Sequence, residues 1–237
     1  MARTIAVLPK GTRITDYISL GVLTQTFSLN AVKAVLASQG KASQRQRELP
    51  AHVVYYVICL ALFRQVSYRE VLRCLLEGLR WWLGPGQALA ATGKSGISQA
   101  RTRLGWQVMR QLHEEVVKPV AVEATQGAWY RRWRLVSLDG STLDVADEKE
   151  NERAFGRPSA SRGQSAYPQM RFVSRVENGT HVLFGTRMAD YATGEVTLAH
   201  EVIAALQKGM RCWADRNFFG FALWNRARAR ELTCCGG

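Results

Sequence analysis

Two aspartates of this chain, Asp139 and Asp215, stand where a carboxylate can do chemistry. Asp139 directly follows residues 135–138, a short and mostly apolar stretch, and Asp215 directly follows residues 210–214, a second strand-like stretch. Short runs of this kind predict β-strands in the middle of a sheet. Because a sheet holds such a strand firmly, a carboxylate at its end is a candidate member of an active site.

The residues around Asp139 also allow a plainer interpretation. Asp139-Gly140-Ser141 is a turn sequence, and Asp-Gly is common in tight β-hairpins. On these residues alone, a hairpin turn and an active-site carboxylate remain equally open.

The segment between the two aspartates predicts a hairpin followed by a helix. Residues 170–176 and 181–188 are strand-like, and Glu177-Asn178-Gly179-Thr180 between them contains the Asn-Gly pair that is typical of hairpin turns. Residues 195–207 carry apolar side chains on one helical face, and a last helix is expected over residues 218–231.

This order of elements predicts that the two aspartates are neighbours. A right-handed crossover through the helix at 195–207 sets the strand at 210–214 parallel to the strand at 135–138. Two adjacent carboxylates repel each other unless a cation lies between them. A pair of magnesium ions ~3.5–4 Å apart would relieve this repulsion and promote phosphodiester chemistry. We therefore expect a mixed α/β chain whose second half has a ribonuclease-H-like nuclease core.

The first half of the chain predicts helices. The second half of residues 14–36 is helix-like, with Ser28 or Asn30 as its cap. Pro50 opens an apolar helix over residues 51–64 that must be buried.

A capping box, Ser67 with Glu70, begins the next helix, which is expected to extend to about residue 82. Two further helices are expected at residues 98–104 and 106–118, with Arg101 and Arg103 exposed on the first.

Together these elements predict an all-α DNA-binding domain over residues 13–118 of the helix-turn-helix kind. An all-helical scaffold with solvated arginines fits the pattern equally well. Residues 119–126 form a linker. Residues 129–133, Trp-Tyr-Arg-Arg-Trp, begin the second domain, where they could stack on bases or cover a sheet edge.

The stretch ATGKSG at residues 91–96 superficially looks like a phosphate-binding loop. Such a loop requires a glycine five residues before Gly93, where this chain has Ala88, and no strand precedes it. The sequence therefore argues against nucleotide binding here.

The composition indicates a polyanionic partner. The chain has 32 Lys and Arg against 19 Asp and Glu, a net charge of +13, and every third of it has a basic excess. Nucleic acid is the usual partner of such a surface, although a generically basic protein would have the same balance. The odd number of cysteines, 5, and the lack of zinc-ligand spacing fit a reducing compartment. Without a membrane-length apolar run or a signal peptide, we expect a soluble, intracellular protein.

Four stretches of the second half carry a family resemblance: LVSLDGSTLDVAD, ENERAFGRP, PQMRFVSRVENGTH and MRCWADRNFFGFALWNRA. They cover most of residues 134–228 and resemble insertion-sequence transposases with an Asp-Asp-Glu site, most closely the family founded by insertion sequence 4. Residues 13–103, with ISLGVLTQTF and SGISQARTRLG, look like the N-terminal helical domain of that family.

The resemblance implies roles for particular residues. Asp139 and Asp215 would be the first two catalytic carboxylates and ligands of Mg²⁺, or of Mn²⁺ as a substitute, in the two-ion site of the complete enzyme. Double-stranded DNA at the element ends would be the partner, bound by a homo-oligomer. The resemblance also implies a bacterial cytoplasmic protein associated with the nucleoid. Basic side chains of both halves are expected to contact phosphates: Arg101, Arg103, Arg157, Arg162 and Arg216.

The third carboxylate of the family lies in a Tyr, two residues, Arg, three residues, Glu, six residues, Lys pattern, and no such pattern follows Asp215 here. Glu231 lies only sixteen residues beyond Asp215 and lacks the accompanying residues. Residues 228–237 end in Cys-Cys-Gly-Gly without an apolar strand, so residues 129–237 are expected to form a partial, C-terminally truncated catalytic domain.

Three functions remain open at this point. The first is a transposase that binds DNA and cleaves and transfers strands with a metal, but is catalytically incomplete without its third acid. The second is a non-catalytic DNA-binding fragment or regulator of transposition. The third is a relic whose exposed sheet edge leads to aggregation or degradation.

Overall fold

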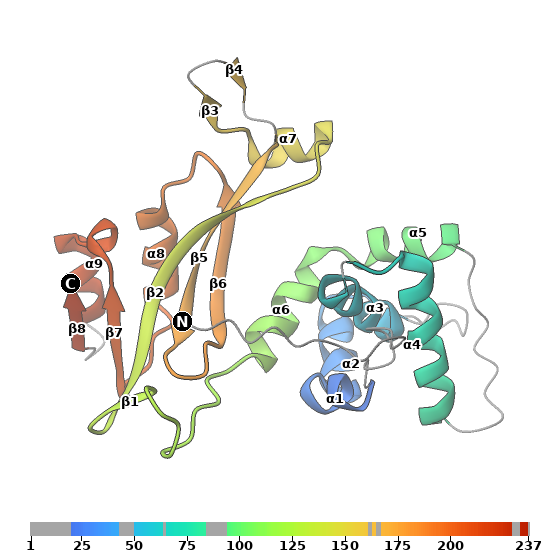
Figure 1. Cartoon of the computed structure of the whole chain (residues 1–237), viewed down its shortest axis with the longest axis horizontal. Helices are drawn as coiled ribbons and strands as arrows, with labels where there is room; N and C mark the ends of the chain where they lie inside the picture. Colours follow the sequence, from blue (N-terminus) through green and yellow to red (C-terminus); the bar gives the residue numbers. More distant parts are fainter. Residues whose placement is uncertain are drawn as a thin grey trace, which may run out of the picture. The chain divides into compact units, whose positions relative to one another are not determined.

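The computed structural model describes residues 20–42, 50–63, 65–83, 94–160, 163–164, 167–228 and 233–236, and the chain divides into two compact units, Met1–Val116 and Val117–Gly237 (Figure 1). The described part of the first unit is entirely helical, and the second unit combines a sheet with helices. The expected mixed α/β class is therefore confirmed. Within the described residues, no helix has the length and apolar character needed to cross a membrane.

The first unit contains the predicted helices and one more. They are α1 (Leu20–Thr26), α2 (Leu29–Ser38), α3 (Pro50–Leu62), α4 (Tyr68–Leu83), α5 (Lys94–Leu104) and α6 (Trp106–Val116). Helix α1 lies ahead of the predicted segment, and α5 begins at Lys94 and not at residue 98. Ser28 caps α2 by accepting from the backbone N–H of Ala31 at 3.2 Å, and Ser67 accepts from the N–H of Glu70 at 3.3 Å where α4 begins. Both serines therefore act as the expected N-caps. Of the ATGKSG stretch, residues 91–93 lie outside the described residues, and Lys94 begins α5.

Helix α3 forms the centre of the first unit. Val54, Tyr55 and Cys59 on this helix are fully buried, and the Tyr55 hydroxyl donates to the carbonyl of Phe27 at 2.6 Å. An apolar helix buried on several sides was the prediction for this segment, and it is confirmed.

The second unit is built on one mixed sheet. Its elements are β1 (Trp129–Tyr130), β2 (Trp133–Asp144), α7 (Lys149–Phe155), β3 (Ser159–Ala160), β4 (Gly163–Gln164), β5 (Gln169–Glu177), β6 (Leu183–Asp190), α8 (Glu195–Ile203), β7 (Met210–Ala214), η2 (Arg216–Phe218), α9 (Phe221–Arg228) and β8 (Thr233–Gly236). The strand order is β6-β5-β2-β7-β8, with β1 paired to β2 and with β3 and β4 in a separate small hairpin.

Strand β2 is longer than predicted. It continues through Asp139 and Gly140 as far as Asp144, antiparallel to β5, with Asp139 opposite Ser174. The hairpin-turn interpretation of Asp139-Gly140-Ser141 is therefore wrong, because β5 supplies a ladder partner for every residue from Val136 to Asp144. The predicted hairpin of β5 and β6 is confirmed.

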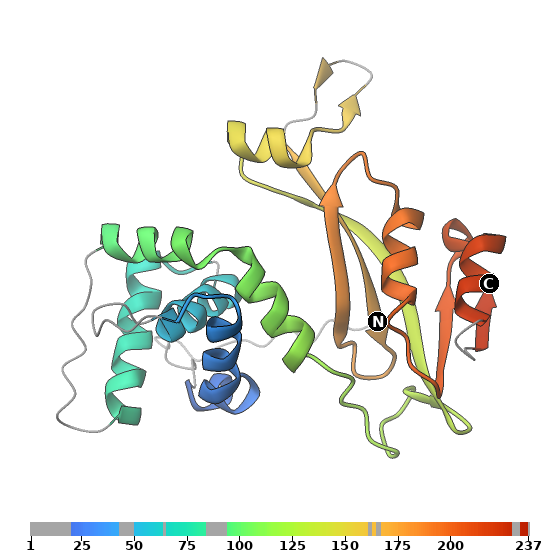
Figure 2. The same ribbon diagram turned by 180° about the vertical axis from the view of Figure 1, so that it is seen from behind.

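The prediction that the strand before Asp215 lies parallel to and beside the strand before Asp139 is confirmed. Strand β7 pairs parallel with β2, and Leu138 lies opposite Ala214. Helices α8 and α9 pack against each other on one face of the sheet, where Leu198, Val202 and Leu223 are buried (Figure 2).

One expectation about the end of the chain is wrong. Thr233–Gly236 forms strand β8, which pairs parallel with β7 and places Cys212 opposite Cys234. The stretch lacks the apolar pattern of a buried strand. It pairs nevertheless, because the backbone N–H and C=O groups along the edge of β7 need hydrogen-bond partners, and this short segment supplies them. Residues 229–232 and 237 lie outside the described residues, and with them Glu231.

Candidate active site

Asp139 and Asp215 occupy equivalent positions on two neighbouring strands. Leu138 and Ala214 are partners in the parallel ladder, and each aspartate is the next residue of its chain. Both aspartates are exposed, whereas Leu138 before Asp139 is buried. The sheet therefore places the two aspartates next to each other on neighbouring strands, and both are accessible from solvent.

Asp215 is also fixed by the turn that follows it. Its Oδ1 accepts from the backbone N–H of Asn217 at 2.9 Å, so that the aspartate caps the short helix η2. An N-cap carboxylate is favoured because it satisfies a backbone donor at the start of a helix.

A third acidic residue, Glu195, lies close to the residue after Asp139 and to the turn after Asp215. It is the first residue of α8, and its side chain rests on the backbone of Gly140, where an added Cβ would meet the Glu195 Cδ at 2.9 Å. Its Oε2 accepts from the Nδ2 of Asn217 at 2.5 Å. Glu195 therefore bridges the residue after Asp139 and the turn after Asp215.

This arrangement suits a hard divalent cation. Magnesium is held by one or two carboxylates and keeps several waters, which other groups can later replace. Asp139 and Asp215 would supply oxygen ligands of that kind, so their chemistry fits the expected ion. Among the residues that the structure describes, no group of three acidic, histidine or cysteine side chains is close enough to hold a metal by itself.

The five arginines expected to contact DNA have different surroundings. Arg216 is exposed and directly follows Asp215. Arg157 is bound by Asp147 and by Glu152, whose Oε1 is 3.1 Å from its Nε, and these carboxylates raise its pKa. A phosphate contact by Arg157 would compete with both ion pairs.

The remaining arginines belong to other parts of the chain. Arg101 and Arg103 are exposed on α5 in the first unit, and Arg162 lies outside the described residues.

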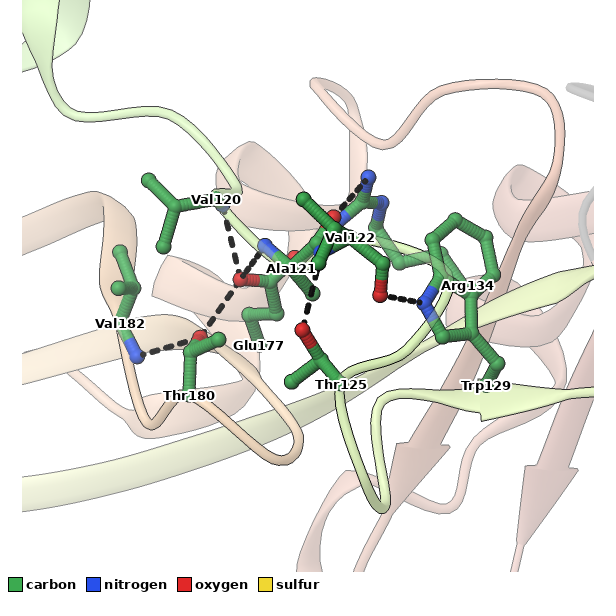
Figure 3. Close-up of polar contacts among 9 residues, drawn as sticks. All are labelled: Val120, Ala121, Val122, Thr125, Trp129, Arg134, Glu177, Thr180 and Val182. Atoms are coloured by element: carbon green, nitrogen blue, oxygen red, sulfur yellow. Dashed lines mark hydrogen bonds and ion pairs between the residues drawn. The ribbon is translucent and has the colours of Figure 1, made fainter.

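A buried carboxylate, Glu177, holds the expected linker onto the second unit (Figure 3). It has 0% exposure, and its Oε2 accepts from the backbone N–H groups of Val120 and Ala121 at 2.9 Å each and from the Thr180 hydroxyl at 2.6 Å. Its other oxygen pairs with Arg134. Burial by itself would raise the pKa of Glu177, but these hydrogen bonds together lower it.

Two residues of the site are absent from the sequence-based prediction. Glu195 and Asn217 have no spacing motif that relates them to the aspartates. The order of the elements did contain a signal for Glu195. Helix α8 follows β6, which ends at the edge of the sheet toward which β2 and β7 run. The first residue of α8 is therefore brought near the two aspartates.

Comparisons with known proteins give a consistent result. Residues 17–114 match the family model described as insertion element 4 transposase N-terminal. Transposase InsG for insertion sequence element IS4, from Escherichia coli strain K12, is 25% identical over 198 residues, which are 82% of this chain and 42% of InsG. A protein of the same strain with the name "Putative transposase InsZ" is 23% identical over 189 residues, 79% of this chain and 60% of InsZ. The chain thus spans about half the length of the curated relatives it matches.

Proposed function

We propose a function from one premise, which is that this chain belongs to the family of insertion sequence 4 transposases. The chain binds duplex DNA at the ends of a mobile element and contributes carboxylates to metal-dependent strand cleavage and transfer. The observation that carries the proposal is the parallel pair Leu138 and Ala214, after which Asp139 and Asp215 stand side by side.

The order of elements supports a ribonuclease-H-like core. Three antiparallel strands, a helix, a parallel strand and a further helix follow one another in β2, β5, β6, α8, β7 and α9. This is the order from which the two aspartates were expected to meet.

The side chains around the pair have separate tasks. Asp139 and Asp215 would hold magnesium, which when bound activates a water or hydroxyl and stabilises the leaving oxygen of a phosphodiester. Asn217 and Glu195 fix the turn that carries Asp215. Arg216, exposed beside Asp215, is suited to hold a phosphate near the carboxylates.

The helical unit supplies DNA binding in this proposal. Helix α5 carries Arg101 and Arg103 on its exposed surface, and the net charge of the chain is +13. Contacts of arginine with phosphates position a protein on a duplex irrespective of sequence.

Cleavage by these 237 residues alone should be weak. Their sequence has no counterpart of the third acidic residue in the Tyr-Arg-Glu-Lys pattern after Asp215. Metal binding is therefore a better first test than cleavage. Mn²⁺ binding by the purified chain, measured by water-proton relaxation, should weaken at least ~10-fold in Asp139→Asn and in Asp215→Asn.

Asp144→Asn is the matched control, because Asp144 lies on the same strand and keeps its hydrogen bond from Gln169 through its remaining oxygen. It should bind Mn²⁺ like the wild type. Equal Mn²⁺ affinity in all four proteins would contradict the proposed metal site.

A second candidate function is a DNA-binding module without chemistry, and the basic charge of the chain favours it equally. The two functions differ in their response to Asp139→Asn. DNA affinity that falls steeply with salt, together with Mn²⁺ binding that does not depend on Asp139, would favour the second function.

A further inference from the structure

A tight turn of two arginines projects from the start of the sheet in the second unit. In the ladder of β1 and β2, Trp129 lies opposite Arg134 and Tyr130 opposite Trp133, so Arg131 and Arg132 form a two-residue loop. Arg131 has φ of 55°, in the left-handed region that favours glycine. An arginine in this position costs about 1 kcal/mol of backbone strain, which a glycine would avoid. Such strain at an exposed charged residue indicates a use for the side chain.

The aromatic residues of this turn support the arginines. The guanidinium carbon of Arg131 lies 5.5 Å from the ring centre of Tyr130, and that of Arg132 lies 5.2 Å from the ring centre of Trp133. Arg211 of β7 stacks on Tyr130 as well, at 5.0 Å. A stacked guanidinium keeps its N–H groups free to point outward, where they can donate to an acceptor. Because guanidinium groups already stack on these rings, phosphate contact is favoured over base stacking.

Side-chain contacts hold the base of the turn in place. Arg134, next to Trp133, pairs with the buried Glu177, and its guanidinium stacks on Trp129 at 4.5 Å. The indole N–H of Trp129 donates to the carbonyl of Val122 at 2.8 Å (Figure 3). A base fixed by such contacts reduces the conformational entropy that the turn would lose on binding a ligand.

The two turn arginines are also available to a partner. Both are exposed, and no carboxylate among the described residues forms an ion pair with either of them. Arg157, in contrast, is bound by two carboxylates. The turn therefore presents positive charge that the rest of the described chain does not neutralise.

We infer that this turn, residues 129–133 with Arg211, is a contact surface for the phosphate backbone of duplex DNA. Arginine matches a phosphate with two parallel hydrogen bonds, and such contacts add affinity without reading bases. Trp133 precedes Asp139 by six residues on β2, about 20 Å along the strand, so the contact is separate from the carboxylates. The inference rests on the proposed function only in that the partner is DNA.

Arg131→Gly provides the test, because it should relieve the backbone strain at residue 131 and remove the side chain that contacts phosphate. Binding to a fluorescent 30-base-pair duplex would be measured by anisotropy over a series of salt concentrations. We expect affinity to fall about 3-fold to 10-fold, and the slope of log affinity against log salt to decrease by about 0.9. The melting temperature should equal or exceed that of the wild type. Arg132→Gln should weaken binding in the same way, and Arg132→Lys should keep the salt slope.

Arg226→Gln is the control for a general loss of charge, because Arg226 is exposed on α9. It should change affinity by less than about 2-fold. If the wild type binds the duplex, and both Arg131→Gly and Arg132→Gln bind it with the same affinity, the inference is overturned but the proposed DNA-binding function is not. An equal loss in Arg226→Gln would overturn it too, since the effect would then be one of net charge. No binding of the duplex by the wild type would overturn both the inference and the proposed DNA-binding function.

Discussion

The side-chain amide of Asn217 donates to the carboxylate of Glu195, and this hydrogen bond ties the turn after β7 to the first residue of α8. The backbone N–H of Asn217 at the same time donates to Asp215. One asparagine thus connects an aspartate of the candidate site to an acidic residue on a neighbouring helix. Residues that orient a metal ligand commonly affect metal affinity although they do not touch the ion.

Asn217→Ala should therefore weaken Mn²⁺ binding by about 10-fold, because the turn that carries Asp215 loses its tether to Glu195. The melting temperature should change little, since Asn217 is exposed and a single exposed hydrogen bond contributes about 1 kcal/mol. Mn²⁺ titration and thermal unfolding of the same preparations measure the two effects.

Asn225→Ala is the control for this prediction, because Asn225 is an exposed asparagine on α9 of the same unit. Glu195→Gln keeps an acceptor for Asn217 and should retain more Mn²⁺ affinity than Glu195→Ala. Wild-type Mn²⁺ affinity in Asn217→Ala would show that the hydrogen bond has no role in orienting Asp215.

Glu177→Gln should destabilise the second unit by about 3 kcal/mol, because it removes the charge that pairs with Arg134 inside the protein. The hydrogen bonds to Glu177 lower its pKa in the folded chain despite burial. Its ionised form therefore stabilises the fold above the pKa of the unfolded chain, and this contribution is lost as the pH falls through the lower, folded pKa. Urea unfolding should thus show a large difference between wild type and Glu177→Gln at pH 7 and a smaller one at about pH 3.

Glu201→Gln is the matched control. Glu201 pairs with Arg187 at 3.3 Å, but its side chain is 59% exposed. A pair of this kind contributes at most about 1 kcal/mol, so the variant should unfold almost like the wild type at both pH values. Equal stability of Glu177→Gln and Glu201→Gln at pH 7 would contradict the anchoring role of Glu177.

Local sequence predicted the main strands and helices of both units, but not α1, α7, β8 or the length of β2. Gly140 and Ser141 favour a turn when they are considered with their nearest neighbours. Their conformation is instead determined by β5, where Val173 and Phe172 lie opposite them. Pairing between distant segments overrides local preference, and such pairing cannot be read from residues 139–141 alone.

The same distinction applies to the candidate site. The adjacency of Asp139 and Asp215 was predictable because an apolar, strand-like stretch precedes each of them and the crossover rule makes the two strands neighbours. Glu195 was not, because its contact with Gly140 depends on how α8 crosses the sheet. The strain at Arg131 also follows from the short loop between β1 and β2, and no residue pattern indicates it.

Gly185 and Arg175 show how closely backbone and side chain can approach in the core of the second unit. Arg175 is only 7% exposed, and burial lowers its pKa to about 10. Its guanidinium donates to the carbonyl of Ala205 and lies 4.5 Å from the ring centre of Phe184. A Cβ on Gly185 would be 1.8 Å from the Arg175 Nη2, and Gly185 has φ of 62°. Glycine is therefore required here both for its conformation and for its lack of a side chain.

Gly185→Ala should lower the free energy of unfolding by at least about 3 kcal/mol, because the methyl group must displace a buried guanidinium in addition to straining the backbone. Gly209→Ala separates the two effects, since Gly209 has φ of 88° but nothing within 4 Å of its added Cβ, and it should cost only about 1 kcal/mol. Urea unfolding of both variants gives the comparison. In the background of Arg175→Ala, where the colliding group is absent, Gly185→Ala should cost no more than Gly209→Ala. If the large loss persists in that background, the collision with Arg175 is not its cause.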